Sequence, residues 1–166
     1  MASNLEVSEY LGLLQEYEAC LSKTYEILAD RFTESQEYSE FFSRLSVEEK
    51  AHEAWVERFR AGVDVGELKV KKMLPKAQMV AAAMDYLKRQ WDHLKAGKPS
   101  LRDALMLGLS IETGMIDNKF LEIAESDSKE FADLLRRLRV ETEDHANRIR
   151  RLLSSLSHVT GFGLSP

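Results

Sequence analysis

The stretch EEKAH at residues 48–52 interrupts an otherwise apolar helix face, and it decides how the fold is read. Around it, apolar side chains recur at helical spacing, which predicts an amphipathic helix with one buried face. The expected members of that face are Tyr38, Phe41, Leu45, either Trp55 or Val56, and Phe59. The same spacing places Glu49 and His52 on the buried face. Both need a partner there, because an unpaired buried charge is costly.

The rest of the chain has the same helical spacing and contains no convincing strand pattern, so we predict an all-α fold. Only three prolines and eight glycines occur among the 166 residues. Helices are expected at about residues 5–32, 37–60, 76–96 and 100–125, with a fifth from the turn at 126–128 to about residue 157. Residues 61–75 are expected to form a loop.

Short links join the first two helices and the last two, so each pair is expected to be antiparallel. The third helix then carries the chain from one hairpin to the other. This order predicts an up-down four-helix bundle with an extra crossover helix. We expect residues 1–158 to form this single domain and residues 159–166 to form a flexible tail.

The overall composition excludes several classes of function. The net charge of −5 argues against nucleic acid as a partner, and the absence of a long apolar run argues against a membrane. A single cysteine, with no leader-like start, favours a cytoplasmic protein. The third helix has an apolar face from Met79 to Trp91, which predicts either a cap on the bundle or the two-fold contact of a homodimer.

Polar residues interrupt the buried faces of the other bundle helices too: Glu18 in the first, Glu112 in the fourth, and Thr142 and His145 in the fifth. Residues equally far from the turn of an antiparallel hairpin lie at the same height, so these residues are expected to meet Glu49 and His52 at one level. Carboxylates and imidazoles gathered in a core predict a metal site. The mixed oxygen and nitrogen donors favour Fe, Mn or Zn over Mg or Ca.

These residues resemble the ferritin-like superfamily, in particular the rubrerythrin-like bundles. That family pattern is a Glu from each of two helices and a Glu-x-x-His from each of the other two, which together hold two iron ions. The matching segments are Glu18 with Tyr25, SVEEKAHEAWV at 46–56, LSIETGMIDNKFLEI at 109–123 and VETEDHANRI at 140–149.

The resemblance implies a diiron protein with Glu18, Glu49, His52, Glu112 and His145 as metal ligands. It implies an enzyme that reduces peroxide or oxygen, or oxidises Fe²⁺, in oxidative stress or iron handling. Because the chain lacks the cysteine pairs of a rubredoxin-like domain, the electron donor is expected to be a separate protein.

The last motif departs from the family pattern, since Thr142 stands where the glutamate belongs. Glu141 is the candidate that replaces it as a ligand. The alternative is a non-catalytic ferritin-like module that binds or senses metal through a degenerate or single-metal site, or a structural helical dimer. Without a metal, Glu49 and His52 form a core salt bridge, Glu112 pairs with an arginine, His145 is a neutral core residue and Glu141 forms an exposed salt bridge.

Overall fold

The structure is a computed structural model that describes residues 3–68, 77–118, 120–121 and 129–160, with the backbone alone at 157–160. It contains five helices, namely α1 (Asn4–Arg31), α2 (Gln36–Asp64), α3 (Ala77–Ala96), α4 (Leu101–Asp117) and α5 (Lys129–Thr160). No strand occurs in these ranges, and the prediction of an all-α chain is confirmed.

α1 begins with a capping box. The side chain of Ser3 accepts a hydrogen bond from the backbone N–H of Glu6, and the Glu6 carboxylate accepts one from the Ser3 N–H.

The end of α2 differs from the prediction, because the helix continues to Asp64 rather than ending at residue 60. Its apolar face extends one turn further through Val63, which is buried. Gly66, with a φ of 78°, then reverses the chain, and the N–H groups of the next two residues donate to the carbonyl of Gly62.

The end of α4 was predicted too late, at residue 125, whereas the helix ends at Asp117. Asn118 donates hydrogen bonds from both its backbone and its side chain to the carbonyl of Gly114, which closes the last turn. Phe120 and Leu121 are buried in the turn that follows. The predicted helix at 122–125 and the turn at 126–128 lie outside the described residues.

α5 extends to Thr160, so the first two residues of the predicted tail are helical. The remaining tail residues, 161–166, lie outside the described part of the chain.

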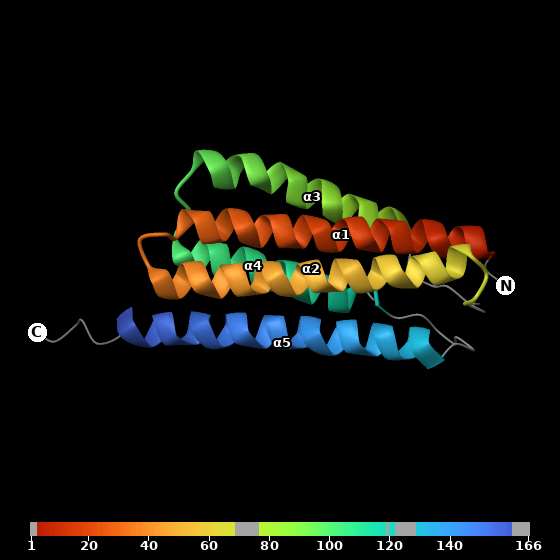
Figure 1. The fold of residues 1–166 in the computed structure, drawn as a ribbon. Coiled ribbons are helices and arrows are strands. Elements are labelled where there is room, and N and C mark those ends of the chain that lie inside the picture. The colour runs from red at the N-terminus through yellow and green to blue at the C-terminus, as the bar shows by residue number, and fades with distance from the viewer. Residues whose placement is uncertain (1–2, 69–76, 119, 122–128, 161–166) are drawn as a thin grey trace, which may run out of the picture.

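Each helix runs opposite to the one before it, and α3 lies on the outer side of α1 (Figure 1). α1 packs against α2, and α4 packs against α5, as the two predicted hairpins require. α2 and α4 therefore run in the same direction, with α3 returning the chain between them. The finer assignment, a ferritin-like bundle with α3 as its crossover helix, stays a prediction.

The core consists of two apolar clusters along the helix axes. One contains Leu14 and Leu21 of α1 and Val56 of α2, and the other contains Leu28 and Leu45. Between them lie the polar residues that interrupt the helix faces, which we call the polar layer. Its members are Glu18, Glu49, His52, Glu112, Thr142 and His145.

The buried face of α2 was predicted through Phe41, but Phe42 is the fully buried residue and Phe41 is half-buried. Phe42 stacks with Tyr25 and Phe32 of α1, so the rotation of α2 about its axis is set by its packing against α1.

The apolar face of α3 is covered within the chain. Val80, Met84 and Leu87 are buried, and the indole N–H of the half-buried Trp91 donates to Thr24 of α1 at 2.9 Å. Because the chain itself covers this face, the face gives no support to the expected homodimer. The homodimer stays a prediction. None of the described helices is long and apolar enough to span a membrane.

Candidate metal centre

The polar layer brings together side chains from α1, α2, α4 and α5, and each of its six residues is at most 2% exposed. Five of them form two groups whose ligand atoms lie within 4.8 Å of one another. The first ligand set is Glu18, Glu49 and His52, and the second ligand set is Glu49, Glu112 and His145. Glu49 belongs to both sets. The five ligands inferred from the family pattern are thus gathered at one level.

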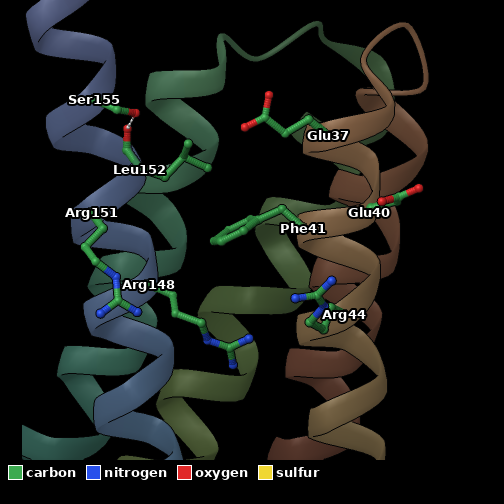
Figure 2. A pocket seen from close by; sticks show the side chains of 8 residues that line it. All are labelled: Glu37, Glu40, Phe41, Arg44, Arg148, Arg151, Leu152 and Ser155. Carbon is green, nitrogen blue, oxygen red and sulfur yellow. Dashed lines mark hydrogen bonds between the residues drawn. The ribbon is translucent and has the colours of Figure 1, made fainter.

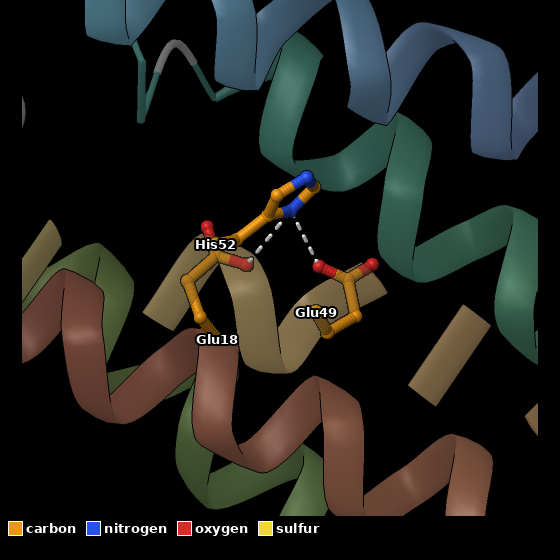
Figure 3. Close-up of side chains that lie close together, drawn as sticks. All are labelled: Glu18, Glu49 and His52. Atoms are coloured by element: carbon orange, nitrogen blue, oxygen red, sulfur yellow. Dashed lines mark hydrogen bonds and ion pairs between the residues drawn. The ribbon is translucent and has the colours of Figure 1, made fainter. Parts of the chain in front are cut away.

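In the first ligand set, two carboxylates face the same nitrogen of His52 (Figure 3). The Nδ1 atom of His52 lies 2.8 Å from Oε2 of Glu49 and 3.7 Å from Oε2 of Glu18. Glu49 and His52 are one turn apart on α2, so their side chains leave the helix on the same face.

The second ligand set repeats this geometry across the helices. Nδ1 of His145 lies 2.7 Å from Oε1 of Glu49 and 3.6 Å from Oε1 of Glu112. Glu49 therefore offers one oxygen to each histidine. The two imidazole rings are nearly parallel, with an interplanar angle of 15° and centroids 5.4 Å apart.

Several oxygens of the two sets are buried without a hydrogen-bond partner. They are both carboxylate oxygens of Glu18, Oε1 of Glu49 and Oε2 of Glu112. The contact between Oε1 of Glu49 and His145 is short but is not aligned as a hydrogen bond. Leaving such oxygens unsatisfied is costly. A cation among them would satisfy them, so these residues fit a bound metal.

In the protein without a metal, protons take the place of the cation. Burial lowers the pKa of each histidine, but the carboxylates beside Nδ1 outweigh it and raise the pKa of His52 to about 11 and of His145 to about 10. Burial would raise the pKa of Glu49, but its close contacts with His145 and His52 lower it to about 2. Burial raises the pKa of Glu18 to about 8, and burial and the charge of Glu49 also raise the pKa of Glu112.

The far nitrogen of each histidine meets a carboxylate from the opposite helix. Nε2 of His52 in α2 lies 2.9 Å from Glu141 of α5, and Nε2 of His145 in α5 lies 3.2 Å from Glu48 of α2. We call Glu48 and Glu141 the outer carboxylates. A histidine whose outer nitrogen is held by a carboxylate is fixed in the orientation and tautomer that present the other nitrogen to a metal.

Glu141 was predicted as a metal ligand, and the structure instead places it outside both ligand sets. Its second oxygen accepts a hydrogen bond from Arg137 at 3.0 Å. Glu48 was not predicted at all, although it precedes Glu49 just as Glu141 precedes Thr142. It is held by Arg148, which also pairs with Asp144.

Thr142 and Tyr25 also lie at this level, but neither belongs to a ligand set. The hydroxyl of Thr142 donates to the Leu138 carbonyl of its own helix at 2.9 Å, so it is satisfied locally. Tyr25 donates to Oε1 of Glu112. Burial and then the charge of Glu112 raise the pKa of Tyr25 well above its ordinary value, so the phenol keeps the proton that it donates.

Comparisons of the chain with protein-family models, with curated proteins and with solved structures find no match. The polar layer is therefore the feature that can indicate a function.

Proposed function

We propose that this protein is a rubrerythrin-like member of the ferritin-like superfamily that holds two divalent metal ions, iron in the functional form. The observation that carries the proposal is the pair of ligand sets that share Glu49. In each set a histidine turns Nδ1 toward buried carboxylates while its Nε2 meets an outer carboxylate. A salt bridge in the core does not explain this arrangement, because the arrangement leaves four buried carboxylate oxygens without a hydrogen-bond donor.

The donor chemistry favours iron, with Mn and Zn as the other ions that the same donors suit. Each set offers carboxylate oxygen and one imidazole nitrogen, whereas Mg and Ca prefer oxygen alone. The three carboxylates of the two sets, of which Glu49 is shared, carry three negative charges against the four positive charges of two such ions. The helix order, with two antiparallel hairpins and α3 between them, agrees with the ferritin-like assignment.

We propose that the reaction is the reduction of a small oxidant, peroxide or oxygen. When bound, an iron pair supplies electrons, two of which, with two protons, convert one hydrogen peroxide into two waters. A separate electron-donor protein would return electrons to the iron pair. The chain has a single cysteine, Cys20, which is buried and free, so it lacks the cysteine pairs of a rubredoxin-like domain.

The chain's own residues hold and shield the centre. Glu18, Glu49 and Glu112 would bind the metal ions. The outer carboxylates orient the two histidines, and Tyr25 positions Glu112 through its hydrogen bond. The apolar clusters on either side of the polar layer exclude bulk water, which strengthens every charge interaction inside it.

Anaerobic loading with Fe²⁺, removal of the excess and a count of iron per chain test the proposal. We expect two ions in the wild-type protein and consumption of added peroxide as the iron is oxidised. His52→Ala should lose an ion, while the matched variant His93→Ala should keep both, because His93 lies on the exposed face of α3. A wild-type chain that binds no iron would end the proposal.

The second candidate is a metal-binding or sensing module with a single ion, and the locally satisfied Thr142 hydroxyl favours it. One ion per chain, with no peroxide consumption, would select this function.

A further inference from the structure

Two grooves lie along the seam between α2 and α5 in the described part of the chain, and a smaller cavity lies between α1, α3 and α4. A groove of about 490 Å³ lies between the first half of α2 and the second half of α5, where Arg148 reaches into it (Figure 2). Arg148 pairs with the outer carboxylate Glu48. A groove of about 760 Å³ is lined by Trp55 and Arg137.

Charged contacts separate both grooves from the ligand sets. In the larger groove, Arg137 pairs with the outer carboxylate Glu141 and lies 3.8 Å from the centre of the Trp55 ring. In the other groove, Arg148 pairs with the outer carboxylate Glu48. A neutral molecule that entered either groove would have to displace an ion pair to reach His52 or His145.

The third cavity, which we call the α3–α4 cavity, has a different chemistry. It has a volume of about 90 Å³, and the nine described residues that line it are all uncharged. They come from α1, α3 and α4 and from the turn after α4. At its rim Tyr86 and Ser110 are exposed, while Tyr17, Leu87 and Ile111 are buried at its inner side. It therefore extends from the surface toward the core.

Tyr17 gives this cavity a polar group with no partner. Its side chain is 3% exposed, and its ring packs edge-on against Phe120 with centroids 5.6 Å apart. Within the described part of the chain, no hydrogen bond to its hydroxyl occurs. The hydroxyl is not among the fully buried polar atoms that lack a partner, so a small molecule in the cavity can reach it and form the hydrogen bond that a tyrosine hydroxyl usually has.

The inner side of the cavity also adjoins the metal centre. Tyr17 and Ile111 immediately precede the ligands Glu18 and Glu112 in the chain.

The volume limits what can bind. A water molecule takes up roughly 30 Å³ of liquid, and a cavity of about 150 Å³ holds benzene. The α3–α4 cavity thus suits a molecule with a few heavy atoms better than an aromatic ring, and its described lining, which carries no charge, favours a neutral molecule.

We infer that the α3–α4 cavity is a size-selective binding site for a small neutral polar molecule, of which hydrogen peroxide is the example, and that Tyr17 is the hydrogen-bond donor that receives it. The cavity then gives the oxidant a route to the ligand sets that avoids the charged α2–α5 seam. Its role as a route for the oxidant rests on the proposed function, whereas binding in the cavity does not.

The first test uses the metal-free protein with labelled isoleucine and leucine methyl groups, and xenon as an unreactive probe. The methyl signals of Leu87 and Ile111 should shift with xenon pressure, while those of Leu105 and Ile149 in the other apolar cluster should stay in place. Unshifted Leu87 and Ile111 signals would overturn the inference.

Filling the cavity supplies the variant. A side chain built on Gly114 would meet no atom within 4 Å, so Gly114→Leu has room to fold. It should abolish the xenon shifts, whereas Ala82→Leu, on the exposed face of α3, should preserve them. Shifts that persist in Gly114→Leu would place the xenon elsewhere and count against the cavity.

The second test uses the Fe²⁺-loaded protein and compares hydrogen peroxide with cumene hydroperoxide. Wild type should react at least about tenfold faster with the smaller oxidant, as size discrimination by a pocket allows. Tyr17→Phe and Gly114→Leu should slow the reaction with hydrogen peroxide while the iron content stays unchanged. Tyr38→Phe, on α2 and outside the described lining of the cavity, is the matched control for the loss of a phenol hydroxyl.

The outcomes separate the two proposals. Peroxide consumption that Tyr17→Phe and Gly114→Leu leave unchanged overturns the cavity inference and preserves the proposed function. Xenon binding at Ile111 in a chain that binds no iron supports the cavity and removes the proposed function.

Discussion

Glu141 of α5 lies 2.9 Å from Nε2 of His52 in α2, on the ring edge opposite the nitrogen that faces Glu49 and Glu18. The carboxylate thus orients the histidine from outside the ligand set. Glu48 stands in the same relation to His145.

Glu141→Ala and Glu48→Ala should therefore weaken metal binding without removing an ion at saturation. Loss of a carboxylate that orients a ligand histidine typically lowers metal affinity by about 10- to 100-fold. Calorimetric titration with Mn²⁺ would measure this, with Glu143→Ala as the matched variant, because Glu143 is half-buried like Glu141 but pairs with Arg139 of its own helix and belongs to neither ligand set. If Glu141→Ala lost one ion even at saturation, Glu141 would be a direct ligand.

Glu49→Gln should abolish both metal positions, while Glu18→Gln should abolish only one. Glutamine keeps the size of the side chain but removes the charge, and only Glu49 offers an oxygen to each histidine. Metal content after loading and gel filtration is the measurement. Equal losses in the two variants would contradict the shared role of Glu49.

The stability of the metal-free protein should fall as the pH rises from neutral. The pKa of His52 is raised to about 11 and that of His145 to about 10 from an ordinary value of 6.5. Their contribution to the free energy of unfolding is complete below pH 6.5 and is lost as the pH passes through these raised values. Calorimetry from pH 6 to pH 10 would detect the fall, and a metal-free Tm that rose across this range would contradict it.

Bound metal should have the opposite pH dependence. A metal ion displaces the protons on Nδ1 of both histidines, so Mn²⁺ should release protons and should raise the Tm more at pH 8 than at pH 6. A pH indicator in weak buffer measures the release. A shift in Tm that did not change with pH would mean that the histidines are not ligands.

Thr142→Glu should raise the affinity for the second ion, because it adds a fourth carboxylate to balance four positive charges in the core. Thr142→Val should leave metal binding unchanged, since the hydroxyl is already satisfied by the Leu138 carbonyl. Titration of both variants with Fe²⁺ under anaerobic conditions compares them directly. Weaker binding in Thr142→Val would show that the hydroxyl contributes to the site.

Leu87→Ala should destabilise the protein by about 2–5 kcal/mol, the usual range for truncating a buried leucine. Leu87 is 1% exposed on the face of α3 that packs against α1, whereas Met79 on the same helix is 37% exposed. Urea unfolding should therefore show a much smaller loss for Met79→Ala. Similar losses in the two variants would mean that α3 does not cover α1 in solution.

Much of the centre was predictable, because a charged residue on an apolar helix face is visible in the spacing alone. Glu18, Glu49, His52, Glu112 and His145 were all found in this way, and all are buried at one level. Helical periodicity gives the face on which a side chain lies, and the two hairpins then bring those faces together.

Helical spacing could not predict the roles of the outer carboxylates, because these roles depend on how α2 and α5 are rotated relative to each other. Glu141 points about 100° away from Thr142 around the helix, and this direction faces α2 rather than the interior. The choice between Phe41 and Phe42 has the same origin, because two adjacent aromatic residues fit the period equally well and contacts with α1 decide between them.

The two ligand sets differ in how far apart their members lie along the chain. Glu18, Glu49 and His52 all belong to the first hairpin, so this set is complete once α1 and α2 have paired. The second set also needs Glu112 and His145, and it exists only after α4 and α5 have docked. Since the N-terminal part of a chain leaves the ribosome first, one metal position can be assembled during synthesis while the other awaits the finished chain. With two ions bound as proposed, the topology predicts that the first ligand set takes up its ion before the second.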